Sequence, residues 1–441
     1  MSGELGFEPS GALSVKARGA RGDGRSKDGP AIQAAIDAVA AAGGGTVLLP
    51  PGGYESGSLF LRDRVELRLE GGARLLGSRD PRDYPLVESR WEGSTQLVHA
   101  SLIHASGSRR IAVTGRGEID GRGEAWWQAF REKRLERPRP RLIALEDCEG
   151  ILLRDFSALD SPSWTVNPQR SRDVLIEGLT IRNPPDSPNT DGINPDSCSQ
   201  VRILGCYVSV GDDCITIKAG TEDERGHLVR PCEDIVIADC VLERGHGGVV
   251  IGSEMSGGVR NVAISNCVLR GTDRGIRVKT RRGRGGSVER VRASNLVMTD
   301  VLCPLAINMR YGCGAWGDPE VSDLGRRERG PGTPSIRGLA LSSITAWGAR
   351  VAAAWIDGLP ESPVEGLSLS DVSIEMGGED EPAPPEMADF VEPRSRSGLV
   401  ARNVSNMMLL GVRISGHRGP AFEISGSSGL SAAHCSPEDP A

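Results

Sequence analysis

Short apolar alternations recur along most of the chain, and their period of two predicts β-strands. They start near Ile111, Ile151, Val174, Val201, Ile235, Val262, Val291, Leu339, Leu367 and Met408. The spacing is 27 residues from Val174 to Val201 and 34 residues from Val201 to Ile235. Periods in the twenties and thirties with strand patterning indicate a solenoid, in which irregular lengths fall in loops.

The pattern predicts an all-β protein, a right-handed, single-stranded parallel β-helix of about ten coils. A propeller would need four strands in roughly every 40–50 residues and a more regular blade motif. A leucine-rich repeat would show a fixed leucine template, which the chain lacks.

One amphipathic helix is predicted at about residues 30–42, where Ile32, Ala35, Ile36 and Val39 fall on one face. A helix ahead of a long run of strands suggests a cap on the open end of the β-helix. We expect a single domain over residues 1–441, with an ordered core at about 15–425. Two segments, 122–142 and 310–334, look like inserted loops, and an irregular tail is expected after Ser425.

Composition limits the partners and suggests the compartment. The net charge of −7 argues against general binding to nucleic acid or to an anionic membrane. Cys206, Cys240 and Cys267 each follow an apolar alternation, so they resemble small buried residues of a stack more than disulfide partners. Free thiols and the lack of an evident signal peptide favour a cytoplasmic location, or a secreted one if a leader is missing. No apolar run is long enough for a membrane helix.

Four charged motifs lie at the same point of successive repeats. They are Asn189-Thr190-Asp191, Gly211-Asp212-Asp213, Gly245-His246-Gly247 and Arg277-Val278-Lys279. Alignment on the inward aliphatic residues puts Ile193, Ile215, Val249 and Ile276 in one column. Because neighbouring parallel strands lie about 4.8 Å apart, Asp191 should stand over Asp213 and Asp212 over His246.

Clustered carboxylates beside basic residues support glycoside hydrolysis. One carboxylic acid must protonate the leaving oxygen while a second carboxylate activates water. Arg277 would bind the carboxylate of an anionic sugar through two parallel hydrogen bonds of its guanidinium, and Lys279 through the compact charge of its ammonium group. Each motif alone is more often a solvated turn or strand face, so only the occurrence of all four in order indicates a catalytic site.

The motifs resemble those of the polygalacturonases of glycoside hydrolase family 28, with Val278 in place of isoleucine as the one departure. The resemblance spans roughly residues 15–425. It implies a pectinase-type β-helix that hydrolyses α-1,4-galacturonosyl bonds with inversion, without metal or cofactor. By position, Asp212 resembles the general acid, Asp191 and Asp213 the water-activating pair, and His246 the support of the acid. Arg277 and Lys279 resemble the clamp on the substrate carboxylate.

Asn189 and Tyr311 complete the candidate substrate-binding residues, although Asn189 also suits a structural turn and the match at Tyr311 is weak. Inversion leads us to expect room for a water and a sugar ring between Asp212 and the Asp191/Asp213 pair. We expect exo-action on pectic oligosaccharides, with the loops 122–142 and 310–334 closing the groove into a pocket.

Three alternatives stay open. The chain could be a β-helix polysaccharide lyase, a rhamnogalacturonan or xylogalacturonan hydrolase, or a non-catalytic glycan-binding β-helix. A lyase would use a calcium-bridged carboxylate cluster and a basic residue, and its product would carry a new double bond. The sequence leaves endo or exo cleavage, the exact pectic substrate and the oligomeric state undetermined.

Overall fold

The computed structural model describes residues 12–222, 230–378 and 381–437, and most of the strands there pair in parallel. The chain divides into two compact units, Met1–Asp212 and Asp213–Ala441. In a stack of coils each coil contacts only its neighbours, so a stack can divide into compact units at any coil. The single domain expected over residues 1–441 therefore stays a prediction. Both units have the strand pairing of a parallel β-helix, which confirms the predicted fold class.

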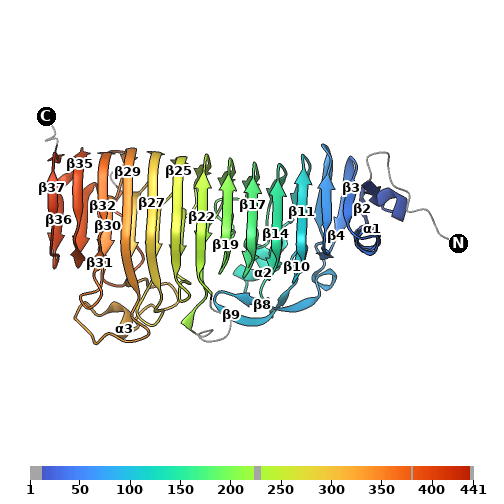
Figure 1. Cartoon of the computed structure of the whole chain (residues 1–441), viewed down its shortest axis with the longest axis horizontal. Helices are drawn as coiled ribbons and strands as arrows, with labels where there is room; N and C mark the ends of the chain where they lie inside the picture. The colour runs from blue at the N-terminus through green and yellow to red at the C-terminus, as the bar shows by residue number, and fades with distance from the viewer. Residues whose placement is uncertain (1–11, 223–229, 379–380, 438–441) are drawn as a thin grey trace. The chain divides into compact units, whose positions relative to one another are not determined.

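In the first unit, one column of parallel strands carries the predicted repeat (Figure 1). Its strands pair in the order β1 (Ala12–Ser14), β3 (Gly45–Leu49), β6 (Val65–Leu69), β11 (Arg109–Gly115), β14 (Glu149–Arg154), β17 (Arg172–Glu177) and β19 (Ser199–Leu204). Ile111, Ile151, Val174 and Val201 are register partners from one strand to the next. The segments that the alternation predicted therefore stack in register. Strands β1, β3 and β6 extend the column ahead of residue 100.

Two further columns complete the coils of the first unit. One contains β2 (Asp23–Lys27), β4 (Gly52–Ser56), β7 (Ala73–Gly77), β12 (Glu118–Asp120), β15 (Ser157–Leu159), β18 (Thr180–Arg182) and β20 (Tyr207–Ser209). The other contains β5 (Leu59–Phe60), β10 (Ile103–Ser106), β13 (Ile143–Glu146) and β16 (Val166–Gln169). Single bridges from Val166 to Ile193 and from Gln169 to Asp196 continue this last column into the motif around Asp191.

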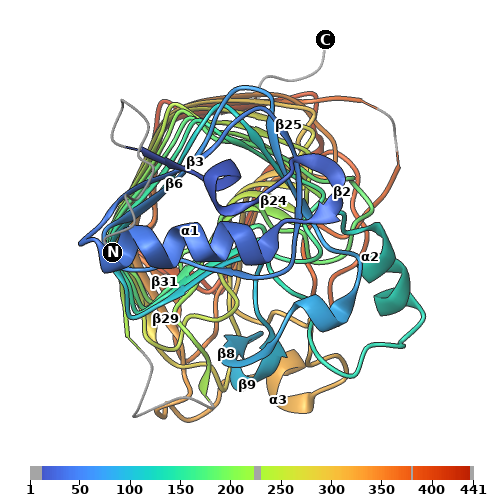
Figure 2. The same cartoon turned by 90° about the vertical axis from the view of Figure 1, so that its right-hand side faces the viewer.

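Helix α1 (Gly29–Ala41) is the predicted cap, and it lies across the end of the coils of the first unit (Figure 2). The predicted apolar face, Ile32, Ala35, Ile36 and Val39, is fully buried. Asp28 occupies the N-cap position, but its carboxylate accepts the backbone N–H groups of Arg21 and Gly22 instead of a helical one. The helix therefore closes the apolar cross-section that an open coil would expose to water.

The second unit has the same construction. Its repeat column runs through β22 (Cys232–Ala238), β25 (Val259–Arg270), β27 (Ser287–Thr299), β29 (Ser335–Ala349), β32 (Ser368–Met376) and β35 (Met408–Ser415) (Figure 1). Ile235, Val262, Val291 and Leu339 are successive register partners. The last predicted start, Met408, is the first residue of β35. Met408 is exposed and Met407 before it is buried, because successive residues of a strand face opposite sides.

A second column of this unit carries the later motifs. It runs through β21 (Asp213–Ile217), β24 (Gly247–Gly252), β26 (Arg274–Lys279), β28 (Cys303–Asn308), β30 (Ala352–Asp357), β33 (Ser397–Arg402) and β36 (Arg418–Ser425). Short strands β23 (Val241–Glu243), β31 (Val364–Glu365) and β34 (Val404–Ser405) pair beside the repeat column. The irregular tail expected after Ser425 is wrong in part, because β37 (Ser431–Ala433) and β38 (Ser436–Pro437) pair with β35.

All ten cysteines carry free thiols, and Cys206, Cys240 and Cys267 are buried in the stack as expected. Among the described residues, no helix has the length and apolar character needed to span a bilayer.

Candidate active site

The first carboxylate of the site, Asp191, follows a tight turn of the first unit. Asn189 adopts a left-handed backbone with φ of 52°, a conformation that asparagine tolerates better than most residues. Thr190 is buried, and its hydroxyl donates to the carbonyl of Ser187. Asp191 is also buried, and its Oδ2 accepts a hydrogen bond from Asn194 Nδ2 at 3.0 Å. The local turn therefore fixes the direction of the Asp191 carboxylate.

Asp212 comes from the next turn of the chain, which requires a glycine before it. A Cβ on Gly211 would lie 2.4 Å from the carbonyl oxygen of Ser187, and only glycine avoids this clash. Gly211 N also donates to Thr190 Oγ1 at 3.3 Å, which ties the two motifs together. Asp212 itself is half-buried. Carboxylate oxygens of Asp191 and Asp212 lie within 4.8 Å of each other.

This short distance corrects the expectation of room for a water and a sugar ring between Asp212 and Asp191. The two residues lie on consecutive turns, and consecutive strands of a parallel stack are about 4.8 Å apart. The gap fits one water hydrogen-bonded to both carboxylates, since such bonds are about 2.7–2.8 Å long. The gap between the two carboxylates is too short to hold a sugar ring in addition to this water.

Asp213 opens β21 in the second unit, and the predicted register holds there. Asp213 pairs with Gly247, Ile215 pairs with Val249, and Val249 pairs with Ile276. A Cβ on Gly247 would lie 3.1 Å from Asp213 Oδ1 and 2.4 Å from the side chain of Val250. The Gly-His-Gly motif therefore leaves space for the Asp213 carboxylate.

Two cations of β26 lie against this carboxylate. Lys279 Nζ donates to Asp213 Oδ2 at 2.7 Å, and Arg277 Nη1 lies 3.6 Å from Asp213 Oδ1. Both cations alternate with the core residues Ile276 and Val278, as predicted, but they are buried, with Arg277 only 1% exposed. Asp213 is therefore a buried carboxylate with two basic partners.

Arg277 also forms a bidentate ion pair with Glu386, a residue that the sequence motifs did not indicate. Its Nε and Nη2 donate to the two Glu386 oxygens at 2.6 and 3.1 Å. Burial alone would raise the pKa of Glu386, but Arg277 and Arg274 outweigh it and lower this pKa to about 2. Burial likewise would lower the pKa of Arg277, but the negative charges of Glu386 and Asp213 reverse this effect and raise it.

Tyr311 lies with these residues in the second unit, as the weak sequence match suggested. Its ring centroid is 5.2 Å from Lys279 Nζ and 5.5 Å from the guanidinium carbon of Arg277. Burial raises the pKa of Tyr311, so its hydroxyl stays protonated around neutral pH. The aromatic face therefore covers both cations.

The remaining predicted residues are placed as follows. His246 is exposed and directly precedes β24. Asn189 Oδ1 accepts a hydrogen bond from Arg139 Nη2 at 2.6 Å, which favours the structural role for Asn189. The two expected neighbour pairs, Asp191 with Asp213 and Asp212 with His246, join residues of different units and stay predictions.

Comparison with known proteins decides the family. Residues 88–385 match the model of glycosyl hydrolases family 28. The chain belongs to this family. A probable polygalacturonase of Vitis vinifera is 33% identical over 378 residues, which cover 83% of this chain and 74% of the relative. An exopolygalacturonase of Zea mays is 25% identical over 387 residues, which cover 84% and 85%.

Solved structures agree on the fold. The hyperthermoactive exopolygalacturonase from Thermotoga maritima matches with a TM-score of 0.73 and 29% identity, over 84% of this chain and 88% of that one. The family 28 exopolygalacturonase of Yersinia enterocolitica matches with a TM-score of 0.80 and 21% identity, over 95% and 78%. The protein is thus a family 28 glycoside hydrolase with a parallel β-helix.

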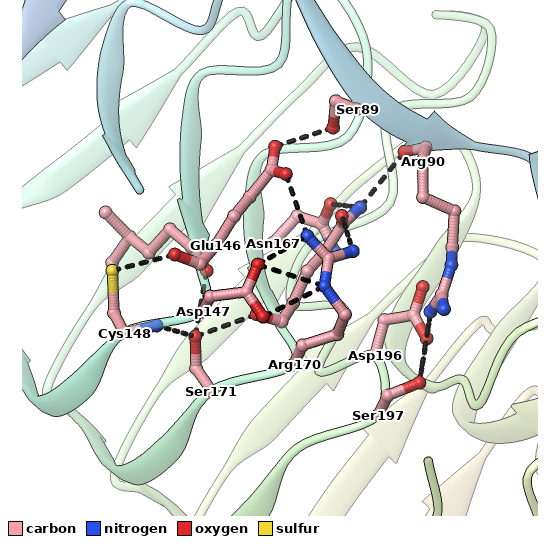
Figure 3. A network of polar contacts seen from close by, with 12 residues as sticks. Ser89, Arg90, Glu146, Asp147, Cys148, Asn167, Arg170, Ser171, Asp196 and Ser197 are labelled. Carbon is pink, nitrogen blue, oxygen red and sulfur yellow. Dashed lines mark hydrogen bonds and ion pairs between the residues drawn. The ribbon is translucent and has the colours of Figure 1, made fainter. Parts of the chain in front are cut away.

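One segment of this hydrolase was not predicted at all, the antiparallel hairpin of β8 (Leu86–Trp91) and β9 (Ser94–His99). Arg90 donates to Asp196 Oδ1 at 2.7 Å (Figure 3). Gln169 Nε2 donates to the carbonyl of Arg90 at 3.0 Å. Ser89 Oγ donates to Glu146 Oε1 at 2.6 Å. The hairpin is therefore fixed to the column that carries the Asp191 motif.

The predicted inserted loops are both present, with structure of their own. Segment 122–142 contains helix α2 (Glu124–Arg131), whose Trp127 donates through Nε1 to the carbonyl of Ser161. Segment 310–334 contains the one-turn helix α3 (Pro319–Ser322). Arg282 holds this segment, because it donates to three of its carbonyls and pairs with Glu361. Both insertions are therefore anchored to the coils by buried polar contacts.

Proposed function

We propose that this family 28 enzyme hydrolyses α-1,4-galacturonosyl linkages in pectin or pectic oligosaccharides, with inversion and from a chain end. The observation that carries the proposal is the pair of carboxylates, Asp191 and Asp212, whose oxygens lie within 4.8 Å on consecutive turns. Polygalacturonases and exopolygalacturonases among the relatives support the substrate class.

In the proposed reaction, Asp212 gives its proton to the glycosidic oxygen as the bond from that oxygen to the anomeric carbon breaks. Water attacks the anomeric carbon from the opposite face. The carboxylates of Asp191 and Asp213 orient this water and accept its proton. His246 supports the acid, and Arg277 and Lys279 supply the positive charge that faces the substrate carboxylate.

Inversion has its own test, because a carboxylate separation of about 5–5.5 Å is typical of retaining enzymes. The short gap between Asp191 and Asp212 still suits a single displacement if it holds the attacking water. Proton NMR of the first product formed should show the inverted β-anomer. A retained α-anomer would exclude the single displacement and make one of the aspartates a nucleophile.

Exo-action is proposed from the hairpin β8–β9. It lies over β16 and the Asp196 end of the Asp191 motif, where a polymer running along that column would otherwise continue. The helix-containing segment 122–142 adds a second wall, since its Arg139 binds the turn at Asn189. A substrate end would then enter a pocket instead of crossing an open groove.

Product analysis tests the proposal against its alternatives. Short incubation with polygalacturonate should release monomer from the outset, with no double bond detected by ultraviolet absorbance and no loss of rate with a chelator. Mixed oligomers would indicate endo-action, and an absorbing, chelator-sensitive product would indicate a lyase. Cleavage restricted to xylogalacturonan or rhamnogalacturonan would name another substrate. Binding without turnover would indicate a glycan-binding protein.

A further inference from the structure

Glu386 is a buried carboxylate from the segment after β32, and it lies against the cations of β26. Its side chain is 0% exposed. Besides the fork to Arg277, it accepts Asn308 Nδ2 at 3.1 Å, and Arg274 Nε lies 3.5 Å from its Oε1. Arg274 also donates to the carbonyls of Pro384 and Pro385. Glu386 is therefore held in one position by side chains from β26 and β28.

Arg277 connects this carboxylate to the proposed active site. Its Nε and Nη2 edge is taken by Glu386, which turns Nη1 toward Asp213 at 3.6 Å. Lys279 donates to the other oxygen of Asp213. Glu386 and Asp213 thus share one guanidinium, and a change of charge at Glu386 reaches Asp213 through a single side chain.

The charges around Asp213 are nearly balanced. Arg277 and Lys279 contribute two positive charges, against which Asp213 and Glu386 contribute two negative ones. Tyr311 is a neutral phenol around neutral pH, and Arg274 is shared between Glu386 at 3.5 Å and Asp273 at 3.3 Å.

Three other titratable groups of the proposed site complete its charge. His246 precedes Gly247, the register partner of Asp213, and Asp212 precedes Asp213 in the chain. Asp191 belongs to the other unit. None of these three is altered by changes at Glu386, so loss of the Glu386 charge would leave an excess positive charge beside Asp213.

We propose that Glu386 is a positioning residue of the hydrolase, which holds Arg277 and balances its charge so that Asp213 stays basic enough to take a proton from the attacking water. The inference rests on the proposed role of Asp213. It adds a third carboxylate to the machinery, one that acts through Arg277 without touching the substrate.

The pH dependence of kcat/KM on a galacturonate oligomer tests this role. Glu386→Gln should move the acidic limb of the pH profile about two pH units lower, the size expected for a unit charge roughly 6–8 Å away at an effective dielectric constant of about 20. The plateau should fall roughly ten-fold, because a weaker base transfers the proton less readily. Glu386→Asp keeps the charge and should restore the wild-type limb. Arg274→Gln removes a positive charge and should move the limb to higher pH.

Glu361→Gln is the matched control. Glu361 is also buried and also forms a fork, accepting Arg282 Nε at 2.6 Å and Nη2 at 3.0 Å. This variant should lose stability while its acidic limb stays unchanged. An unshifted limb in folded Glu386→Gln, or an equal shift in Glu361→Gln, would overturn the proposal. If Glu386→Gln fails to fold, Arg274→Gln provides the test. An acidic limb that is unshifted or moved to lower pH in Arg274→Gln would overturn the proposal.

Failure of the proposed function would look different. A wild-type protein that hydrolyses neither polygalacturonate nor its oligomers would refute the function itself. If the wild-type enzyme is active and the acidic limb of its pH profile is unchanged in Glu386→Gln and Arg274→Gln, only the role of Glu386 is refuted.

Discussion

Asp212 is the residue on which the proposed chemistry depends most. Asp212→Asn removes the proton donor but keeps the shape of the side chain, so kcat should fall on the order of 10²–10⁴-fold while oligomer binding persists. Steady-state kinetics and calorimetric binding would measure the two effects. Asp186→Asn is a suitable control, because Asp186 is exposed and pairs only at the surface with Arg131. Unchanged turnover in Asp212→Asn would refute the acid role.

Gly211 should be needed for both stability and activity. Its Cβ in Gly211→Ala would overlap the Ser187 carbonyl, and overpacking of this kind costs about 1–3 kcal/mol. The thermal midpoint should fall, and kcat should fall with it because Asp212 is displaced. Gly71→Ala is the control, since nothing lies within 4 Å of its added Cβ. Equal behaviour of the two variants would show that the turn tolerates a side chain.

At this scale the sequence predicted the charged motifs but not all of their partners. Asp213 and Lys279 could be aligned because both belong to the repeat, and the structure joins them by an ion pair. Glu386 could not be found in this way. It lies 109 residues from Arg277 in a segment with no repeat pattern, and only the folded chain brings the two together.

At the scale of elements, the hairpin β8–β9 should determine the products. Arg90→Gln removes the buried ion pair with Asp196, at a cost of about 3–5 kcal/mol. A loosened hairpin should let longer chains pass, so mixed oligomers should appear beside monomer in chromatography of early products. Arg172→Gln, which alters an exposed pair with Glu149 in the same unit, should leave the products unchanged.

Elements were predictable where the repeat was visible. Helix α1 and the strands of the repeat column follow from local alternation and helical spacing, which the folded chain retains. The hairpin was missed because residues 86–99 lack the apolar alternation of the coils: Leu86 and Val87 are adjacent, as are Leu97 and Val98, with mostly polar residues between them. Helix α2 was missed because it has only 8 residues, too few for a helical period to show its apolar face with Trp126 and Trp127.

For the whole molecule, acid should remove stability in a defined pH window. The pKa values of Glu386 and Glu254 are lowered to about 2, by Arg277 and Arg274 for the first and by Lys218 and Arg284 for the second, against the effect of burial. A lowered pKa stabilises the fold above the unfolded value near 4.5, and this stabilisation is lost as pH falls from 4.5 toward 2. Each group should contribute on the order of 3 kcal/mol at neutral pH.

Denaturant unfolding between pH 6 and pH 2 would measure this effect. The free energy of unfolding should fall steeply below about pH 4.5. Glu386→Gln should lower stability at pH 6 and flatten the slope, because one titrating group is gone. An identical slope in this variant would contradict the assigned pKa direction. The cytoplasmic location stays a prediction, and it is separate from this stability argument.

The most direct test of the account compares the first products of wild-type enzyme and Asp212→Asn on polygalacturonate by chromatography and proton NMR. The proposed mechanism predicts galacturonic acid monomer from the wild type, released as the β-anomer without a new double bond. A folded, substrate-binding Asp212→Asn should release product on the order of 10²–10⁴-fold more slowly. Unsaturated products, or full turnover by Asp212→Asn, would contradict it.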